Sequence, residues 1–324
     1  MKPIGGYFEL ADREELRGFP HTGGILLNTG RNALEYILMS IGQVRKVYLP
    51  LYTCEVVLEP LQRLGIPWEF YHINSQFELD EEVNPGKGEY IVLNNYLGVK
   101  DQYIAKMAAV FGEKLIVDCA QAFFAPVIEG IKCFYSARKF VGVSDGGVAY
   151  PFNDSLDESK FPVHDSNKHS EHLFIRKEKG AEAGFSTYQA DEELLNKQTL
   201  HRMSSFTEDI LLHINYVTVV EKRKQNYAVL EKALKGSNLY DLPNMDSFTC
   251  PMAYPYLVEK GSELRKKLIQ NKVFVPMFWP NMQEWSKDGS IENTIAMNTC
   301  FIPIDQRYDQ VDMKRIIEII CKLQ

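Results

Sequence analysis

The most informative part of the chain consists of three short pieces: Val117-Asp118-Cys119-Ala120-Gln121-Ala122, then Ser136-Ala137-Arg138-Lys139-Phe140, and then Ser144-Asp145-Gly146-Gly147-Val148. The run that leads into it, residues 114–117, is mostly apolar and predicts a strand with Asp118 at its carboxyl end. Cys133-Phe134-Tyr135 predicts a second strand, which places Lys139 just beyond its end and ahead of a glycine pair. A carboxylate and a lysine therefore follow two successive strands.

The pair Asp118 and Lys139 has the chemistry of a pyridoxal phosphate (PLP) site. A lysine amine bonds to the aldehyde of that cofactor, and a carboxylate keeps its pyridine nitrogen protonated, so that the ring accepts electrons. Taken alone, Lys139 is typical of a surface lysine after a strand, and Asp118 of an ordinary strand-end cap. Their combination with the glycine-rich closure favours the cofactor site over these structural roles.

A predicted helix begins upstream, at the sequence NTGRN (28–32). Apolar residues recur there at helical spacing as far as Ile41, and Asn28 or Thr29 has the side chain of an N-cap. The backbone N–H groups of Gly30, Arg31 and Asn32 would then point outward, and a helix amino terminus of this kind forms a cradle for a phosphate. The alternative is a plain capped helix without a ligand.

Strands and helices alternate between residues 46 and 118. Strand patterns cover 46–50, 67–73 and 89–93, and helical patterns cover the segment before Gly65 and residues 103–111. This alternation predicts an α/β fold with a mostly parallel central sheet flanked by helices. Ligands collect at the carboxyl ends of such strands. We therefore expect one shared site from the residues at those ends: Thr29, Tyr52, Asn95, Asp118 and Ser136.

The character of the chain changes after Tyr150. Residues 152–190 are rich in polar and charged side chains, which predicts an excursion over the surface. Three histidines lie in this segment, His164, His169 and His172. Because no carboxylate or cysteine accompanies them at a metal-ligand spacing, we expect a solvated loop and no metal site.

Two domains are expected from the remaining pattern. A helical pattern covers 192–235 as one long helix or two, and a smaller α+β unit follows it. The large domain would span residues 1–235, with its core at 25–150. The small C-terminal α+β domain would span 236–324.

Composition and charge exclude several classes of protein. The 324 residues are 45% hydrophobic and 24% charged, as in a globular protein with a large core. A net charge of −7 gives no basic field for nucleic acid. No apolar run reaches the roughly 18 residues of a membrane span, and the first seven residues lack the apolar core of a signal peptide. The six cysteines are widely spaced, so we expect reduced thiols and a cytoplasmic protein.

Several motifs in order carry a family resemblance: NTGRNAL (28–34), LPLYTC (49–54), VDCAQA (117–122), CFYSARKF (133–140) and SDGGVAY (144–150). In this order the chain resembles the fold type I PLP enzymes, and within them the DegT/DnrJ/StrS sugar aminotransferases. Arg202-Met203-Ser204 and Arg223-x-x-Asn226-Tyr227 are similar to helix motifs of that group. Several motifs in the right order are more specific than any one alone.

The resemblance implies a fold type I PLP-transferase fold and a role for each matching residue. Lys139 would bond to the cofactor and shuttle the proton, and Asp118 would pair with the pyridinium nitrogen. Gln121 would lie near the ring and its phenolic oxygen, with a local capping role as the alternative.

The phosphate would be held by Ser136 and by the backbone of Gly30 and Arg31. Members of the family usually carry the phosphate-contacting serine further ahead of the lysine, where this chain has Phe134. Ser136 is therefore either the phosphate contact or a local capping residue.

Two further positions depart from the family pattern. Where the family stacks an aromatic residue on the cofactor ring, this chain has Cys54, with Tyr52 two positions earlier. Either side chain would face the ring, and Tyr52 would stack better. The family's asparagine that reaches the neighbouring subunit's phosphate is replaced by Leu200, for which His201 or Arg202 would substitute.

The expected function is PLP-dependent amino transfer from glutamate to a nucleotide-linked keto-sugar, in cell-surface polysaccharide or related sugar biosynthesis. The resemblance also implies a homodimer with the site at its interface. Substrate contacts are expected from Asn95, Tyr96 and Arg202, and acceptor recognition from loops 152–190 and 278–308. Two alternatives stay open: a PLP lyase or dehydratase, and a cofactor-free relative that serves as an assembly or regulatory partner. Lys139 argues against the dehydratase, which usually replaces that lysine.

Overall fold

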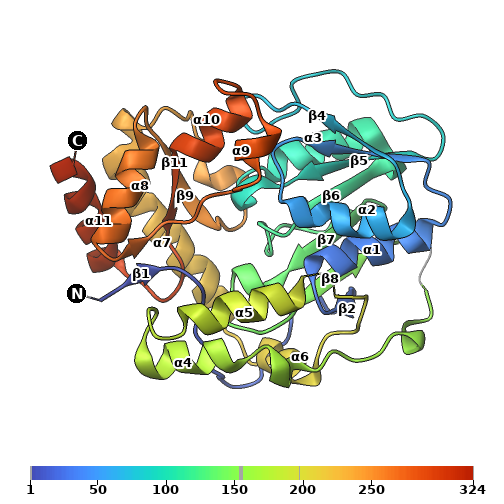
Figure 1. Cartoon of the computed structure of the whole chain (residues 1–324), viewed down its shortest axis with the longest axis horizontal. Coiled ribbons are helices and arrows are strands. Elements are labelled where there is room, and N and C mark those ends of the chain that lie inside the picture. Colours follow the sequence, from blue (N-terminus) through green and yellow to red (C-terminus); the bar gives the residue numbers. More distant parts are fainter. Residues whose placement is uncertain (1, 153–155, 197, 324) are drawn as a thin grey trace.

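A seven-stranded, mostly parallel sheet forms the centre of the larger part of the chain (Figure 1). Its strands are β2 (Ile25–Leu27), β3 (Lys46–Pro50), β4 (Trp68–Tyr71), β5 (Glu89–Asn94), β6 (Leu115–Cys119), β7 (Lys132–Ser136) and β8 (Gly147–Tyr150). The computed structural model describes residues 2–152, 156–196 and 198–323, so residues 153–155 of the expected excursion lie outside the described residues.

The strands lie in the order β2-β8-β7-β6-β5-β3-β4. The run from β4 to β7 is parallel, whereas β8 pairs antiparallel with β7, and β2 pairs antiparallel with β8. The connection from β7 to β8 therefore turns back at the carboxyl edge of the sheet. This connection carries Lys139 and the glycine pair.

Helices cover both faces of the sheet. Helices α1 (Gly30–Ile41) and α2 (Leu58–Leu64) pack on the face that contains Ile116. Helices α3 (Asp101–Phe111), α6 (Ser205–Leu212) and α7 (Tyr216–Leu234) contribute to the core on the face that contains Val117. Adjacent strand residues point to opposite faces, so a strand buried on both sides reads as a continuous apolar run. This explains why β6 was recognisable in the sequence.

The segment expected to be a surface excursion contains two helices, α4 (Glu171–Lys179) and α5 (Phe185–Leu195). His172 Nδ1 lies 2.5 Å from Asp191 Oδ2 and links them. The rings of His164 and His169 stack with their centroids 4.9 Å apart. The expectation of solvated histidines is wrong, because all three are buried among polar and aromatic partners. Across the ranges that the structure describes, no cluster of three or more potential ligands has metal-binding geometry.

The helical pattern expected at 192–235 as one helix or two is interrupted twice. Helix α5 ends at Leu195, and α6 and α7 follow as separate helices. The side chains of Ser204 and Asn215 accept hydrogen bonds from the first turns of α6 and α7, respectively. Such N-caps end the preceding segment and start a new helix.

The C-terminal part of the chain packs beside the sheet (Figure 1). It contains β9 (Ala253–Leu257), α8 (Gly261–Gln270), β10 (Val273–Phe274), α9 (Met282–Trp285), α10 (Ile291–Asn298), β11 (Thr299–Pro303) and α11 (Gln310–Leu323). Strands β9 and β11 pair antiparallel, and the N-terminal β1 (Ile4–Gly5) pairs parallel with β10. The two ends of the chain therefore meet in this part.

The architecture confirms the expected α/β fold class, with its parallel sheet, flanking helices and C-terminal α+β layer. The sequence patterns missed the sheet strands β2 and β8, and also β11, α9 and α10, because these elements are short or lack a clear period. Among the residues with described positions, none of the helices has the length and apolarity to cross a bilayer.

Candidate active site

Three polar residues lie side by side at the carboxyl edge of the sheet. Asn94 ends β5 and pairs in register with Asp118 of β6, while Ser136 ends the adjacent β7. All three side chains point to the sheet face that α1 covers. Side chains two residues apart on a strand share a face, and the residues two positions earlier, Val92, Ile116 and Phe134, belong to the core cluster that includes α1. All three line one cavity of about 210 Å³, which we call the lysine cavity.

Lys139 enters the lysine cavity from the single helical turn Ala137–Lys139 that follows β7. Its Nζ forms no hydrogen bond or ion pair with any described residue, although Asp118 and Glu192 line the same cavity. A lysine amine held in a cavity without an acceptor is available for covalent chemistry. The structure thus brings Asp118 and Lys139 together, as their strand-end positions predicted.

Two opposed influences act on the Asp118 carboxyl group. Burial raises its pKa, and the amine of Lys139 and the backbone N–H of Ala120, 2.7 Å from Oδ1, act in the opposite direction. Cys54 lines the same cavity, and burial likewise raises the pKa of its thiol, against the charge of Lys139. A second positive charge in the cavity would stabilise the Asp118 carboxylate further.

The amino terminus of α1 faces the lysine cavity. Thr29 caps the helix, and its Oγ1 accepts a hydrogen bond of 3.1 Å from Asn32 N. The cap therefore uses the N–H of Asn32. Of the first-turn donors expected to face outward, the N–H groups of Gly30 and Arg31 remain available. These two have no acceptor among the residues with described positions, which suits an anion.

Gly147 explains how β8 approaches this helix so closely. A Cβ at position 147 would lie 2.2 Å from Thr29 O and 2.9 Å from Gly30 N. Only a residue without a side chain permits this packing. The glycine pair in the sequence thus serves the approach of the strand to the helix amino terminus.

The turn before Gly147 is fixed by a buried carboxylate, Asp145. Its oxygens accept hydrogen bonds from Ser204 N and Ser204 Oγ, both at 2.8 Å, and from Thr207 Oγ1. His164 Nδ1 lies 3.1 Å from Asp145 Oδ2. The start of α6 and the segment after β8 thereby hold the connection that carries Lys139.

Gln121 and Asn94 present unused polar atoms at the lysine cavity. Gln121 Oε1 accepts a hydrogen bond of 3.1 Å from Leu97 N, but its buried Nε2 has no partner. Asn94 Nδ2 donates to Thr53 Oγ1 at 3.2 Å, and Asn94 Oδ1 is buried without a partner. Buried polar atoms of this kind are rare unless a ligand or water completes them.

Arginine side chains at the cavity are engaged with protein acceptors. Arg31 Nη1 donates to Glu59 Oε1 at 2.9 Å and to Asn196 Oδ1 at 3.1 Å. Arg138 Nη2 donates to Glu192 Oε1. The backbone of Arg31 is therefore the better candidate for anion contact than its guanidinium.

Several expected site residues lie away from the cavity. Tyr52 is fully buried because its ring packs on Trp279, 5.0 Å between centroids, and its hydroxyl donates to Phe278 O. Tyr96 is also buried, and its hydroxyl donates to Tyr52 O at 2.6 Å. Arg202 donates from Nε to Phe161 O at 3.1 Å, at the edge strand β2. Of the two candidates for the ring-facing position, the structure places Cys54 at the cavity and Tyr52 behind it.

Asn95 lines the lysine cavity, but its amide is used inside the protein. Its Oδ1 accepts from Lys100 N at 3.1 Å, and its Nδ2 donates to Asp101 Oδ1 at 2.7 Å. This arrangement fixes the loop after β5 and leaves little of Asn95 for a substrate.

Trp279 is a cavity residue that sequence reasoning missed. It comes from the C-terminal part, lines the lysine cavity, and packs on Tyr52. The aromatic loop Phe278-Trp279-Pro280 was visible in the sequence, but no period or spacing connects it with β6 and β7. Glu192 was missed for the same reason, since its partner Arg138 is 54 residues away.

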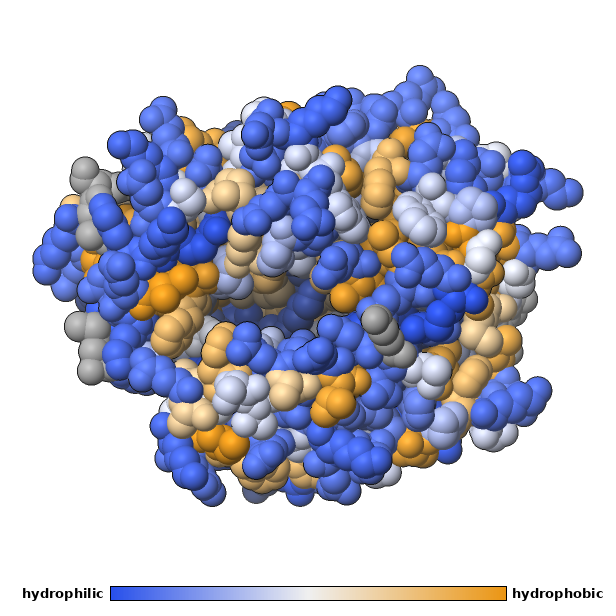
Figure 2. All heavy atoms as spheres, in the orientation of Figure 1, coloured by the Kyte–Doolittle hydropathy of each residue, from blue (hydrophilic) through white to orange (hydrophobic). Residues whose placement is uncertain are grey.

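A second, larger cavity of about 820 Å³ adjoins the first. Ser136, Arg138, Lys139 and Glu192 line both, so Lys139 stands at their junction. The larger cavity, which we call the large chamber, extends toward the C-terminal part, and Figure 2 shows the corresponding hollow in the surface.

No family model matches the chain, and no curated protein matches it in sequence. Its structure is similar to those of solved aminotransferases. A DegT DnrJ EryC1 StrS aminotransferase from Brucella abortus is 14% identical with a TM-score of 0.60, over 93% of this chain and 85% of that one. The sugar aminotransferase CalS13 from Micromonospora echinospora is 16% identical with a TM-score of 0.62, over 92% and 87%.

A third similar structure is the PLP form of Spr1654, a candidate sugar aminotransferase from Streptococcus pneumoniae. It is 14% identical with a TM-score of 0.63, over 93% of this chain and 88% of that one. At identities this low the comparison shows a shared fold, which extends over 92–93% of this chain.

Proposed function

We propose that this chain is a PLP-dependent aminotransferase of the DegT/DnrJ/StrS type, which transfers an amino group to the keto group of a sugar. The observation that carries the proposal is the placement of Lys139 and Asp118 around one cavity at the carboxyl edge of the sheet. The shared fold supports it, since the similar structures are described as sugar aminotransferases and one is a PLP form.

The residues of the lysine cavity fit this cofactor. Asp118 has a carboxylate whose pKa burial raises, and which a protonated ring nitrogen would stabilise. Gln121 Nε2 is a buried donor without a partner, suited to a phenolic oxygen. The free N–H groups of Gly30 and Arg31 at the amino terminus of α1 suit a phosphate, with Ser136 Oγ beside them as a further donor.

When bound, PLP supplies an electron sink for charge that develops at the carbon beside the transferred nitrogen. Binding, proton transfer and the exclusion of water would be the work of the protein's own side chains. Lys139 Nζ would hold the cofactor, and when free the same amine would take up a proton and deliver it within the cavity. Asp118 would supply the negative charge that keeps the ring nitrogen protonated. Cys54 and Trp279 close the cavity walls and limit the access of water.

The resemblance supports finer parts of the proposal. Glutamate is proposed as the amino donor, and a nucleotide-linked keto-sugar of surface polysaccharide biosynthesis as the acceptor. A cytoplasmic homodimer with the site near its interface is proposed as the working form. Exposed Phe174, Phe185 and Leu194 on α4 and α5 support such an interface, because large apolar side chains at this exposure favour burial against a partner.

The test is a titration of the PLP-loaded protein with L-glutamate, followed by absorbance and by release of 2-oxoglutarate. The expected result is conversion of the bound cofactor to pyridoxamine phosphate with one 2-oxoglutarate per site, and no conversion in Lys139→Ala. Protein that binds no PLP overturns the proposal. Protein that binds PLP but transfers no amino group from any amino acid favours a lyase instead.

A further inference from the structure

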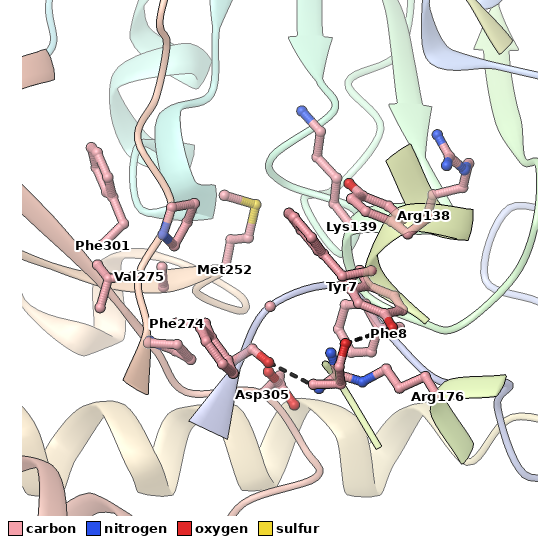
Figure 3. A pocket seen from close by; sticks show the side chains of 18 of the residues that line it. Tyr7, Phe8, Arg138, Lys139, Arg176, Met252, Phe274, Val275, Phe301 and Asp305 are labelled. Carbon is pink, nitrogen blue, oxygen red and sulfur yellow. Dashed lines mark hydrogen bonds between the residues drawn. The ribbon is translucent and has the colours of Figure 1, made fainter. Parts of the chain in front are cut away.

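The lysine cavity and the large chamber meet at a group of polar and charged side chains. Four residues line both spaces, and we call them the junction residues: Ser136, Arg138, Lys139 and Glu192. Figure 3 shows Arg138 and Lys139 side by side at one end of the large chamber, whereas Arg176 lies at the other end. A molecule that reacts at the Lys139 amine therefore comes to lie against Arg138.

Arg138 uses only part of its capacity to donate hydrogen bonds. Its Nη2 donates to Glu192 Oε1, whereas its Nε is buried without a partner. Its Nη1 has no acceptor among the described residues either. A guanidinium holds a carboxylate best through two parallel N–H···O bonds. Arg138 therefore has donors left for an oxyanion that meets it in this geometry.

Glu192 is the resting counter-ion of Arg138 and is free to leave it. Burial acts to raise the pKa of the Glu192 carboxyl group, but the charge of Arg138 outweighs burial, so the pKa is lowered and the group is ionised at neutral pH. The Glu192 side chain lies on α5 and keeps 34% of its surface exposed. An ion pair with an exposed member contributes little net stability. Exchange of Glu192 for another carboxylate therefore costs little.

Arg138 is the only described arginine that lines both spaces. Arg31 lines only the lysine cavity, where its Nη1 donates to Glu59 Oε1 at 2.9 Å. Arg176 and Arg223 line only the large chamber. A carboxylate next to the reacting amine is therefore best placed to bind Arg138.

This position of Arg138 matches the chemistry of an amino acid. The transferred nitrogen and the carboxylate of an α-amino acid are attached to the same carbon atom. A nitrogen that reacts at the cofactor held by Lys139 therefore brings its carboxylate to the junction residues. The reacting carbon of a keto-sugar carries no carboxylate, so the two substrates of the proposed reaction differ in the group that an arginine recognises.

We infer that Arg138 binds the α-carboxylate of the amino donor, which takes the place of the Glu192 carboxylate on the guanidinium. The inference rests on the proposed function and deepens it, because it names the residue that selects an amino acid as the donor. Without a donor, Glu192 neutralises Arg138. When a donor binds, the Glu192 carboxylate turns to solvent.

The amino acid α-methylglutamate tests this contact by binding alone, because it has no α-hydrogen to transfer. Its dissociation constant for the PLP-loaded protein, measured by the absorbance of the bound cofactor, should rise about 10- to 100-fold in Arg138→Gln. Arg138→Lys keeps the charge and should recover part of the loss. Glu192→Gln should bind the ligand more tightly than the wild type, because the competing carboxylate is gone. Arg45→Gln, which alters an exposed arginine outside both spaces, is the matched control, and thermal melts confirm that each variant is folded.

Two amides of glutamate show which end of the donor Arg138 contacts. L-Isoglutamine has an amide in place of the α-carboxylate, and L-glutamine has an amide in place of the side-chain carboxylate. In the wild type, kcat/KM for conversion of the bound cofactor should be at least about tenfold lower with L-isoglutamine than with L-glutamate. Arg138→Gln should abolish this difference and keep any difference between L-glutamate and L-glutamine. Equal use of L-glutamate and L-isoglutamine by the wild type, or a difference that persists in Arg138→Gln, overturns the inference.

Phosphate ligands separate this role from a contact with the cofactor or with a nucleotide. Arg138→Gln should leave the affinities for PLP and for uridine diphosphate near those of the wild type. A loss of either affinity as large as the loss for α-methylglutamate would assign Arg138 to a phosphate and overturn the inference. Failure of the proposed function reads differently, because the wild type would then hold no PLP, or no amino acid would convert it, and both proposals would fall.

Discussion

Asp118 combines a buried position with a charge that needs a partner. Burial raises the pKa of its carboxyl group, and the Lys139 amine opposes this. A protonated pyridine nitrogen would add a second and closer opposing charge. The carboxylate is thus held where its charge is costly until the cofactor is bound.

Removing the charge at this position should weaken the binding of the cofactor more than it lowers the stability of the fold. We expect Asp118→Asn to raise the dissociation constant of PLP by roughly 10- to 100-fold, because a hydrogen bond to a charged group contributes about 1.5–3 kcal/mol. Equilibrium titration followed by absorbance measures it. The exposed variant Asp80→Asn is the control, and equal affinities for both variants would remove Asp118 from the site.

Trp279 should report directly on what enters the lysine cavity. Loading the protein with PLP is expected to quench tryptophan emission, chiefly that of Trp279, because this indole lines the cavity. Trp279→Phe should lose most of the quenching, and Trp285→Phe, which alters an indole packed on Phe70, should retain it. Equal quenching in the two variants would place the cofactor elsewhere.

Single-residue roles were predictable only where a local pattern carried them. Asp118 and Lys139 each follow an apolar run, so their places at strand ends could be read from the sequence. Trp279 and Glu192 reach the site through contacts between segments far apart in the chain, and no period marks them. Tyr52 was expected at the ring, but its packing against Trp279 takes it out of the cavity.

At the scale of elements, the site depends on the fit between β8 and α1. The backbone of Gly147 contacts Thr29 and Gly30 so closely that a methyl group has no room. Any displacement of the helix amino terminus also moves the free N–H groups that we assign to the phosphate.

Gly147→Ala is therefore expected to lower both stability and cofactor affinity. Overpacking at such a contact costs about 1–3 kcal/mol, measurable by chemical denaturation, and PLP titration should show weaker binding. Gly236→Ala is the matched control, because a Cβ there has no neighbour within 4 Å. Normal PLP affinity in Gly147→Ala would show that the phosphate does not lie at this helix.

Elements were predictable in proportion to the strength of their apolar period. Strands β3 to β7 and helix α1 carry clear apolar patterns and were predicted, whereas the short strands β2 and β8 were not. Helices α4 and α5 were missed because buried polar pairs, such as His172 with Asp191, hold them in place. In the sequence such polar residues are indistinguishable from those of an exposed loop. Their burial is decided by tertiary partners that are distant in the chain.

His21 is a titratable side chain buried in the core of the molecule. Its Nε2 lies 2.7 Å from Phe123 O and its Nδ1 lies 3.3 Å from the Tyr150 hydroxyl, an arrangement that suits the neutral ring. Burial lowers the pKa of His21 from 6.5 to about 4. Between these values the unfolded chain binds a proton that the folded chain does not.

Stability should therefore fall as pH falls through this window. The contribution of His21 is fully present above pH 6.5, and about 3 kcal/mol is lost as pH drops to about 4. Denaturation at several pH values measures it, and His21→Gln should flatten the slope by that amount. Parallel pH profiles for the two proteins would contradict the account.

Borohydride reduction of the PLP-loaded protein shows which residue holds the cofactor, and we expect it to be Lys139. Reduction fixes the cofactor on the amine through a stable C–N bond, and peptide mass spectrometry locates it. We expect one label per chain, on Lys139, and none in Lys139→Ala. A label on another lysine, such as the buried Lys100, or no label at all, would contradict it.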